Sequence, residues 1–366
     1  AAQQAGCEGQ QTLNAMICLD EIRGRLAEVF ALKDYKIDHV VHGAIASAAV
    51  YGAMMGATAE QIESAIGLTV AHYVPFRAIR SGDQLSDSKG ASAAISAEVA
   101  VTSMRRAMRG FVGPADIFRN AQAIFCLFEP PTTADHSPFE LQLATTGSDF
   151  AIMDMHFKLG LYEHQSAGAI QGLIDLLQQY PHVLDDIGKL DSVRIEIYEP
   201  AFSIIGDPAK RDPKNRQSAD HSMVYIIATL LRKAFESKKT EWTDLMLLPV
   251  DYDHEALFHP MTRELMDRIE FSHGGEDYDS RYPDGIPTTL QIQHVEFGSL
   301  SSGLVMYPLG HARNSSAEID VVFFEKALRL AELGIGQPTD LLERLSRMRD
   351  GTPEEVSNLY SFDADW

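Results

Sequence analysis

Residues 43–56 are the most apolar run of the chain, and small side chains make up much of it. The run is shorter than the ~20 uninterrupted apolar residues that a membrane-spanning helix needs. It also contains Ser47. Small side chains allow helices to approach one another closely. We therefore expect a buried helix that packs tightly against neighbouring helices in a globular protein, and no membrane span.

Further helical patterns fill most of the first 125 residues. The stretch Thr58-Ala-Glu-Gln61 has the spacing of a capping box, in which two side chains bond each other's backbone N–H groups. Gly110 is a typical residue at the end of a helix. Helices are expected over residues 12–31, 37–51, 58–69 and 90–109.

The pattern changes after Phe125. Residues 129–150 contain three prolines and several Ser, Thr and Asp residues, which is typical of a linker or surface loop. Residues 193–197 alternate strictly between apolar and polar side chains, as a half-buried strand does. An amphipathic helix is expected over 218–235, two strands joined by a Gly/Ser loop over 290–293 and 303–307, and helix again over 317–349.

These patterns predict a mainly α protein. We expect a large all-α domain over residues 1–150, a smaller α+β domain over 151–315, and helices over 316–366 that return to the helical domain. A chain of 366 residues is long for one core and typical of two.

The formal net charge of −21 argues against a nucleic-acid partner, because phosphate binding needs a basic surface. An anionic substrate would be repelled by this global field, so its site must gather Lys, Arg and His locally. Three scattered cysteines predict neither a disulfide framework nor a zinc or iron–sulfur site, and they favour a reducing compartment. No metal site or cofactor is expected.

Asp38 and His39 stand where a polar segment becomes an apolar helix, and His42 follows one turn later. In a structural interpretation Asp38 caps the helix and the histidines bond backbone groups. A metal site is the weaker alternative, because the two histidines have no further ligand at a defined spacing.

Arg77, Arg80 and Lys89 surround one Gly-containing loop of an acidic chain. They are either ordinary solvated cations or a carboxylate clamp, because Arg binds carboxylates through two bonds and Lys supplies a compact charge.

Two further pairs occur in the second half of the chain. Lys158 lies in an apolar stretch that leads to His164, and it could merely extend its charged end to solvent. His221 and Tyr225 have the spacing of one helical turn, which more often marks a packed tyrosine than a catalytic one.

The stretch Tyr307-Pro-Leu-Gly-His-Ala-Arg313 ends a predicted strand and contains His311. It is either a simple strand-to-helix turn or a group of backbone N–H donors and cations that bind an anion.

Taken together and in this order, these segments resemble the MmgE/PrpD family from about residue 10 to about residue 345. The resemblance includes Ala15-Met-Ile, Glu21-Ile22 and Asp38-His39, then the loop cations, the Lys158…His164 element and the helix with Tyr225. The Tyr-Pro-Leu-Gly-His-Ala-Arg stretch is its most specific part and is similar to the branch that acts on 2-methylcitrate.

The resemblance implies a metal-independent hydro-lyase that dehydrates 2-methylcitrate to 2-methyl-cis-aconitate in propionate catabolism, within the methylcitrate cycle. Its partner would be a small tricarboxylate, and its assembly a homodimer built mainly through the helical domain. The compartment would be the cytoplasm in a bacterium or the mitochondrial matrix in a eukaryote.

The resemblance also implies roles for ten residues. Elimination needs a base, an acid for the departing hydroxyl and cations for three carboxylates. His39 or His164 would be the base, and Lys89 and Tyr225 would donate protons, although base and acid stay unassigned. The substrate-binding set would be Arg77, Arg80, Lys158, His221, His311 and Arg313. We expect His39, Arg77, Lys89, Lys158 and Tyr225 to converge on one cleft.

One feature departs from the family pattern. Family members begin with a further helical segment that carries an Asp…Thr…His cluster, and this sequence does not supply it. This departure is the only support for a non-catalytic scaffold or pseudoenzyme. The nearer alternative is cis-aconitate decarboxylase or a related lyase of the same family, which would share most of these cations.

Overall fold

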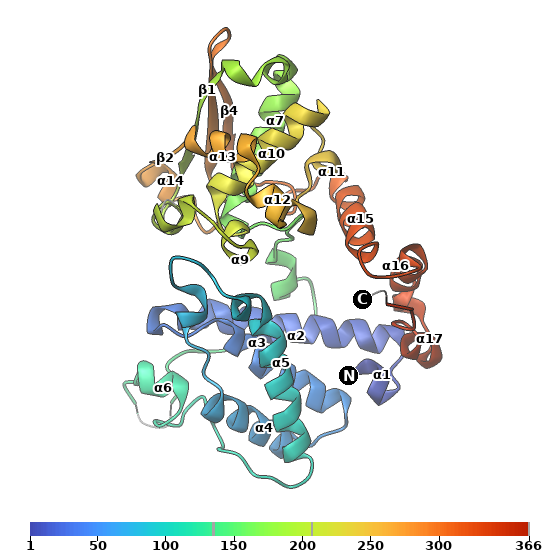
Figure 1. Cartoon of the computed structure of the whole chain (residues 1–366). Helices are drawn as coiled ribbons and strands as arrows, with labels where there is room; N and C mark the ends of the chain where they lie inside the picture. The colour runs from blue at the N-terminus through green and yellow to red at the C-terminus, as the bar shows by residue number, and fades with distance from the viewer. Residues whose placement is uncertain (134–135, 206–207, 365–366) are drawn as a thin grey trace. The chain divides into compact units, whose positions relative to one another are not determined.

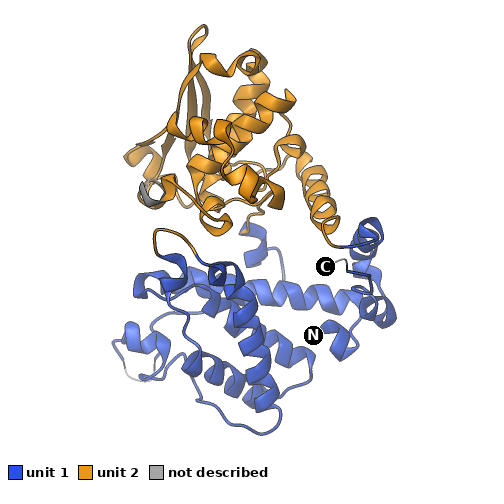
Figure 2. Cartoon of the chain, viewed as in Figure 1, with its two compact units in different colours: residues 1–81, 86–154, 335–366 blue, residues 82–85, 155–334 orange. Residues whose placement is uncertain are grey.

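The computed structural model describes residues 1–133, 136–205 and 208–364. The chain forms two compact units, which Figure 2 colours separately. Unit 1 comprises residues 1–81, 86–154 and 335–366, and unit 2 comprises residues 82–85 and 155–334. Each unit has its own hydrophobic core. The chain thus returns to unit 1 from Ile335, and the helix before that residue belongs to unit 2.

Unit 1 is built from helices and short 3-10 turns (Figure 1). Its helices are α1 (Ala2–Ala5), α2 (Gly9–Val29), α3 (Val40–Met54), α4 (Ala59–His72), α5 (Asp87–Ala107), α6 (Ile124–Phe128), α16 (Pro338–Ser346) and α17 (Pro353–Ser357). Its 3-10 turns are η1 (Leu32–Tyr35), η2 (Arg77–Arg80), η3 (Ala151–Asp154) and η9 (Met348–Asp350).

Helix α3 is the apolar run of the sequence, and it contacts α2, α4 and α5. Ala44 and Ala48 are fully buried. At Gly52 an added side chain would overlap the side chains of Met104 and Ile62 and would force them to shift. The predicted buried helix is therefore confirmed, and its neighbours belong to the same chain.

The ends of two helices follow local sequence signals. At α4, Thr58 Oγ1 accepts a hydrogen bond from Gln61 N, and Gln61 Oε1 accepts one from Thr58 N, so the predicted capping box is confirmed. Helix α5 begins at Asp87, earlier than expected, because the backbone N–H of Lys89 already bonds Ser86 O. Lys89 therefore lies in the first turn of α5, and the expectation that it ends a loop was wrong.

A buried carboxylate of α2 holds the segment that leads to η3. Glu21 accepts hydrogen bonds from the backbone N–H groups of Ala144 and Ala151, at 2.7 and 2.6 Å, and from Arg25 Nε at 3.0 Å. Burial opposes ionisation of Glu21, but these hydrogen bonds outweigh it and lower the pKa of the carboxyl group. The ionised side chain thus fastens the loop to α2.

Unit 2 combines a mixed sheet with helices (Figure 1). Its described strands are β1 (Leu190–Ile197), β2 (Ile269–His273), β3 (Thr288–His294) and β4 (Gly298–Val305), in the order β2-β1-β3-β4. Its helices are α7 (Ala167–Gln179), α8 (Ala201–Ile205), α9 (Arg216–Ala219), α10 (Met223–Ser237), α11 (Trp242–Leu245), α12 (His254–Leu257), α13 (Pro260–Asp267), α14 (Glu276–Asp279) and α15 (Glu318–Ala331). Its 3-10 turns are η4 (His164–Ser166), η5 (Pro181–Asp185), η6 (Ile187–Lys189), η7 (Pro208–Arg211) and η8 (Pro249–Tyr252).

The strand expected over 193–197 is β1, which pairs parallel with β2 and antiparallel with β3. The predicted hairpin is β3–β4, but its turn was misplaced. His294 pairs with Gly298, and His294 Nδ1 accepts hydrogen bonds from the backbone N–H groups of Glu296 and Phe297. These bonds close the turn before the Gly/Ser segment, which therefore lies within β4.

Helix α7 packs against β3 and β4, and α10 contacts α7 and α13. Gly168 and Gly172 of α7 allow this close approach, because a side chain at either would press on Thr288 or Ser302. Helix α10 buries most of its residues in the core of unit 2. The expected mainly α architecture with a smaller α+β part is confirmed.

The C-terminal helices contact the N-terminal helices, as expected: α17 contacts α1, and η9 contacts α2. Gly9 at the start of α2 lies directly against the backbone carbonyl of Met348, so this contact leaves no room for a side chain. Within the described residues, no helix combines the length and the apolar character needed to cross a bilayer.

Candidate active site

Unit 1 contains a buried ion pair at the start of α3. Nε and Nη2 of Arg80 donate hydrogen bonds to the two carboxylate oxygens of Asp38. Asp38 is fully buried, and its Oδ1 also accepts a hydrogen bond from Val40 N at 3.2 Å. Asp38 thus bonds the first residue of the helix, but the N-cap position is His39, one residue later than expected. Asp38 also binds one of the predicted clamp residues, Arg80.

His39 and His42 differ in their surroundings although they lie one turn apart. The side chain of His39 is 65% exposed, and its Nδ1 lies 3.6 Å from Asp38 Oδ1. Partial desolvation lowers the pKa of His39 against the opposing effect of Asp38, and Arg80 and nearby guanidinium groups lower it further. His42 is buried, which lowers its pKa to about 4, and its ring nitrogens have no hydrogen-bond partner among the described residues. Both imidazoles therefore favour the neutral form.

Two other predicted cations belong to unit 1. Arg77 begins η2, and its backbone N–H donates to Lys36 O at 2.8 Å. Within the described part of the chain, its guanidinium has no ion-pair partner, in contrast to that of Arg80. Lys89 is half-buried in the first turn of α5. Unit 1 thus carries His39, Arg77, Arg80 and Lys89.

Unit 2 brings three imidazoles together, which we call the histidine cluster: His156, His164 and His311. The ring of His156 stacks on that of His311 with centroids 3.9 Å apart and on that of His164 with centroids 5.2 Å apart. Burial and the neighbouring imidazoles lower the pKa values of His164 and His311 to about 4. His164 and His311 are therefore neutral at neutral pH.

Hydrogen bonds define the tautomers of two of these rings. His156 Nδ1 accepts from the backbone N–H of Ala312, and His311 Nδ1 accepts from that of Arg313, each at 3.1 Å. In a neutral imidazole the other nitrogen then carries the proton. Nε2–H of His311 is thus a buried donor without a hydrogen-bond acceptor among the described residues.

Two cations, Lys158 and Arg313, act electrostatically on the histidine cluster. The positive charge of Lys158 acts on His164, and that of Arg313 acts on His311. Arg313 pairs with Asp284, whose carboxylate also accepts a hydrogen bond from Tyr307 Oη at 2.7 Å. Lys326 of α15 donates a hydrogen bond to the backbone carbonyl of Lys158. Four predicted residues, Lys158, His164, His311 and Arg313, therefore meet in unit 2.

Gly310 shapes the turn that carries His311. Its φ of +89° is a left-handed conformation, and a side chain there would overlap the backbone carbonyl of Phe157. The N–H of Phe157 bonds the carbonyl of Gly310 at 2.8 Å. This close pairing of two segments brings His156 next to His311.

Tyr225 and His221 do not lie on one helix, which corrects the expectation from their spacing. Ser222 interrupts the helix, because its Oγ accepts a hydrogen bond from Tyr225 N and begins α10. His221 therefore precedes α10, and its Nδ1 bonds the carboxylate of Asp220. Tyr225 is fully buried, and its hydroxyl group donates to Asp251 O at 2.6 Å. Burial raises the pKa of this phenol to about 12, so the geometry favours a structural role for Tyr225.

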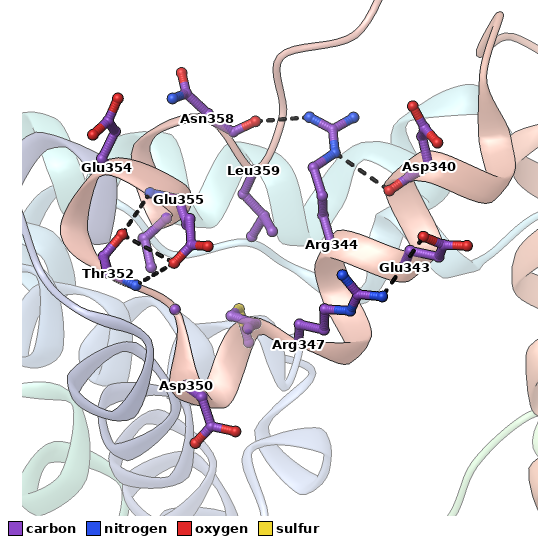
Figure 3. A pocket seen from close by; sticks show the side chains of 13 residues that line it. Asp340, Glu343, Arg344, Arg347, Asp350, Thr352, Glu354, Glu355, Asn358 and Leu359 are labelled. Carbon is purple, nitrogen blue, oxygen red and sulfur yellow. Dashed lines mark hydrogen bonds and ion pairs between the residues drawn. The ribbon is translucent and has the colours of Figure 1, made fainter.

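A cavity of about 760 Å³ lies elsewhere in unit 1, among α16, η9 and α17 (Figure 3). None of the predicted site residues lines it. Its Arg344 donates to the backbone carbonyls of Asn358 and Ser361, both at 2.8 Å, and Arg347 lies 4.0 Å from Glu343. With these cations already paired and carboxylates on its rim, the cavity is a poor site for a tricarboxylate.

The described residues contain no group of three or more His, Cys, Asp and Glu side chains placed to hold a metal ion. In the histidine cluster the rings stack face to face, so their nitrogens do not point toward a common centre.

Comparison with known proteins agrees with this division of the chain. Residues 1–135 match the MmgE/PrpD N-terminal domain, and residues 162–338 match the MmgE/PrpD C-terminal domain. The chain belongs to the MmgE/PrpD family. The two matches cover most of unit 1 before residue 154 and most of unit 2.

Several curated members of the family are similar to this chain. It is 23% identical to the 2-methylcitrate dehydratase of Salmonella typhimurium over 338 residues, and this match covers 90% of this chain and 65% of that protein. It is 25% identical over 338 residues to the mitochondrial 2-methylcitrate dehydratase of Yarrowia lipolytica, covering 89% and 61%. It is 26% identical over 362 residues to the alkylcitrate dehydratase phiI of a fungal species, covering 96% and 66%. The chain thus spans less than two thirds of the length of these relatives.

Two members of the unit 2 site were not found from the sequence. His156 lies immediately before the Phe157-Lys158 pair, but nothing local connects it to His311, which is far away along the chain. Glu163 directly precedes His164 and is buried with a pKa raised to about 7 by that burial. A carboxylate beside a candidate histidine was visible in the sequence, whereas its burial was not.

Proposed function

We propose that this protein is a hydro-lyase that dehydrates a 2-alkylcitrate, with 2-methylcitrate as the first candidate substrate and 2-methyl-cis-aconitate as the product. The observation that supports this best is the histidine cluster, in which His164 and His311 are neutral, with Lys158 and Arg313 beside it in a chain of net charge −21. Such a local group of cations and imidazoles can bind a polyanion that the rest of the molecule repels.

Elimination of water needs a base and an acid. A neutral imidazole can take the carbon-bound proton, and His164 stays neutral because its pKa is lowered to about 4. Carboxylates of a bound substrate would raise this pKa and make the imidazole a stronger base. The departing hydroxyl needs a proton, and the imidazolium formed at His164 can return the proton that it took. Nε2–H of the neutral His311, a buried donor with no acceptor among the described residues, can hold the departing hydroxyl by a hydrogen bond. The carbon–carbon double bond forms as hydroxyl leaves with a proton as water.

The remaining residues take supporting roles in this proposal. Lys158 holds one substrate carboxylate. Arg313, whose side chain is 54% exposed, binds a second one by exchanging its ion pair with Asp284 for the substrate. The candidates of unit 1 keep the roles that the resemblance implies for them: Arg77 and Lys89 as substrate-binding or proton-donating cations, and His39 as the alternative base. We assign Arg80 to positioning the start of α3, because its guanidinium is bound by Asp38 and is not offered to a substrate. We assign Tyr225 and His221 to the scaffold of unit 2, since Tyr225 bonds Asp251 O and His221 bonds Asp220.

The proposed mechanism uses no metal ion and no organic cofactor. Dialysis against a chelator should therefore leave the rate of dehydration unchanged. Loss of activity on chelation, with recovery on addition of one divalent metal, would contradict this part of the proposal.

A substrate with a longer alkyl chain is the second candidate. It is favoured by the alkylcitrate dehydratase relative, which matches this chain over 362 residues at 26% identity. Both candidates need the same carboxylate-binding groups and the same elimination, and they differ only in the apolar group beside the reacting carbons. Decarboxylation of cis-aconitate within the same family is the further alternative.

The test is to incubate the purified chain with 2-methylcitrate, 2-hexylcitrate and cis-aconitate in parallel. Dehydration is followed by the ultraviolet absorbance of the new conjugated alkene, and decarboxylation by released CO₂. Preference for either alkylcitrate supports the proposal and names the substrate. Release of CO₂ from cis-aconitate alone would replace it with the decarboxylase, and absence of turnover and of binding would favour a non-catalytic scaffold.

A matched pair of variants tests the assigned site. His164→Asn should lower the rate by about 10²–10⁴, the usual effect of losing a general base or acid. His182→Asn is the control, because His182 is 76% exposed near Asp185 and lies outside the cluster. Equal rates for both variants would remove His164 from the mechanism.

The homodimer implied by the resemblance is also a proposal. Light scattering at micromolar concentration tests it, and a monomeric mass would contradict it.

A further inference from the structure

The carboxyl group of Glu163 lies at the start of the turn that carries His164. Its side chain is 3% exposed. One oxygen accepts a hydrogen bond from Ser166 Oγ, and the other accepts one from Gln165 N at 2.7 Å. These bonds close η4, which continues directly into α7. The position of His164 in the histidine cluster therefore depends on this buried carboxyl group.

Lysines act on Glu163, and the charge of Glu163 acts on three buried tyrosines. Lys158, which precedes it along the chain, and Lys210 of η7 favour its ionised form. Three buried tyrosines are coupled to it electrostatically: Tyr162 beside it, Tyr198 after β1 and Tyr252 of η8. The hydroxyl groups of two are occupied, because Tyr252 donates to Leu161 O and Tyr162 accepts from Leu159 N.

These influences nearly balance at neutral pH. Burial raises the pKa of Glu163 to about 7, although Ser166, Gln165 and the two lysines act in the opposite direction. Both protonation states are therefore accessible under ordinary conditions. The ionised carboxylate accepts both hydrogen bonds, whereas the protonated group can donate to Ser166 Oγ, since a hydroxyl group both donates and accepts. The turn can thus keep its hydrogen bonds while its charge changes.

We propose that Glu163 is a positioning residue for the reaction: it fixes the turn that presents His164, and its ionisation makes the neighbouring imidazole a stronger base. This inference rests on the proposed function. A negative charge favours the imidazolium form of a nearby histidine, so proton abstraction by His164 is easier when Glu163 is ionised. Activity should therefore rise with pH through the range in which Glu163 loses its proton.

The decisive variant is Glu163→Gln, which keeps the size of the side chain and can still accept the hydrogen bond from Gln165 N. We expect kcat to fall by at least about tenfold, the rate equivalent of one pKa unit, with a smaller change in KM. The rise of kcat near pH 7 should disappear. Asp175→Asn is the matched control: Asp175 is another carboxylate of this region, on α7, and it bonds Gln171. It should keep the wild-type pH profile.

Ser166→Ala gives a second, independent variant. It removes the hydroxyl group that favours the ionised carboxylate and leaves Glu163 in place. The rise of kcat should therefore move to higher pH, which a purely structural role would not produce. An unchanged pH profile in both Glu163→Gln and Ser166→Ala would overturn the proposal.

A measurement without substrate separates this inference from the proposed function. In infrared difference titration, the carbonyl band of a protonated carboxylic acid should disappear as the pH rises through neutrality. The band should be absent from Glu163→Gln and present in Asp175→Asn. Its presence in a protein that turns over no alkylcitrate would refute the function while leaving the buried titrating group intact. Its absence from the wild-type protein would refute the inference itself.

Discussion

Arg80 donates two hydrogen bonds to the buried carboxylate of Asp38, so the guanidinium that the sequence assigned to a substrate is bound within its own unit. Burial opposes ionisation of Asp38, but Arg80 outweighs it and lowers the pKa of the carboxyl group. The pair joins η2 to the start of α3. Arg77, the other cation of η2, has no carboxylate partner among the described residues.

Breaking this pair should cost stability. Asp38→Ala leaves Arg80 without its partner in a largely buried position, and we expect a loss of up to about 3 kcal/mol in the free energy of unfolding, measured with urea at pH 7. Arg77→Ala is the control and should change stability by less than about 0.5 kcal/mol. If Asp38→Ala and Arg77→Ala lose similar amounts of free energy of unfolding, the ion pair does not stabilise the fold more than an unpaired arginine does.

The same pair gives a pH dependence whose sign is set by Asp38. Because the folded state lowers the pKa of Asp38, the contribution is present above the unfolded pKa and is lost as the pH falls through the folded value. The stability difference between wild type and Asp38→Ala should therefore shrink below about pH 4, near the ordinary pKa of an aspartate.

Lys89→Ala should affect turnover more than folding. A lysine in the first turn of a helix faces the positive end of the helix dipole, so its removal should cost no more than about 0.5 kcal/mol. If Lys89 binds a substrate carboxylate or the departing hydroxyl, its loss should lower the rate by about 10²–10³. Lys89→Arg should not restore the rate fully, because a planar guanidinium does not replace a compact ammonium group.

The control for Lys89 is Arg105→Ala, which removes an exposed cation from the last turn of the same helix. Melting temperature and rate are measured on the same preparations. A Lys89→Ala protein with normal melting and normal turnover would make Lys89 an ordinary surface residue.

The sequence predicted the elements that local rules determine. The apolar run became α3, Thr58 and Gln61 form the capping box, and residues 193–197 lie in β1. It did not predict β2, since that strand joins the sheet through its pairing with β1, which no local pattern encodes. It also extended one helix through Ser222, although the side chain of that serine caps α10.

The candidate site was predictable to a similar degree. Residue type and order along the chain pointed to His164 and His311, but their neighbour His156 became evident only from the pairing of Phe157 with Gly310. Charge alone could not show that Arg80 binds Asp38, because a cation in a loop has the same sequence signature whether its partner is a substrate or the protein.

Tyr225→Phe distinguishes a structural tyrosine from a catalytic one. The hydroxyl group of Tyr225 is buried and donates to Asp251 O, so its removal leaves a buried carbonyl without that donor. We expect a loss of about 1–3 kcal/mol in the free energy of unfolding and a rate within about twofold of wild type at a temperature where both proteins are folded. A rate loss of about 10² or more with normal stability would instead support the proton-donor role.

His42→Leu should make the protein less sensitive to acid. His42 is buried in α3 with both ring nitrogens unpartnered among the described residues, and its pKa is lowered to about 4. The folded state therefore binds fewer protons than the unfolded state between pH 4 and pH 6.5, and stability falls as the pH decreases through that window.

Leucine has no proton to gain and suits the apolar core around α3, so at pH 7 we expect a change in the free energy of unfolding below about 1.5 kcal/mol. Between pH 6.5 and pH 4 the variant should lose less stability than wild type, in urea denaturation at matched ionic strength. His72→Leu at the end of α4 is the control, because His72 is exposed and should leave the slope unchanged. If His42→Leu and wild type lose stability in parallel, then His42 is either paired or protonated inside the folded protein.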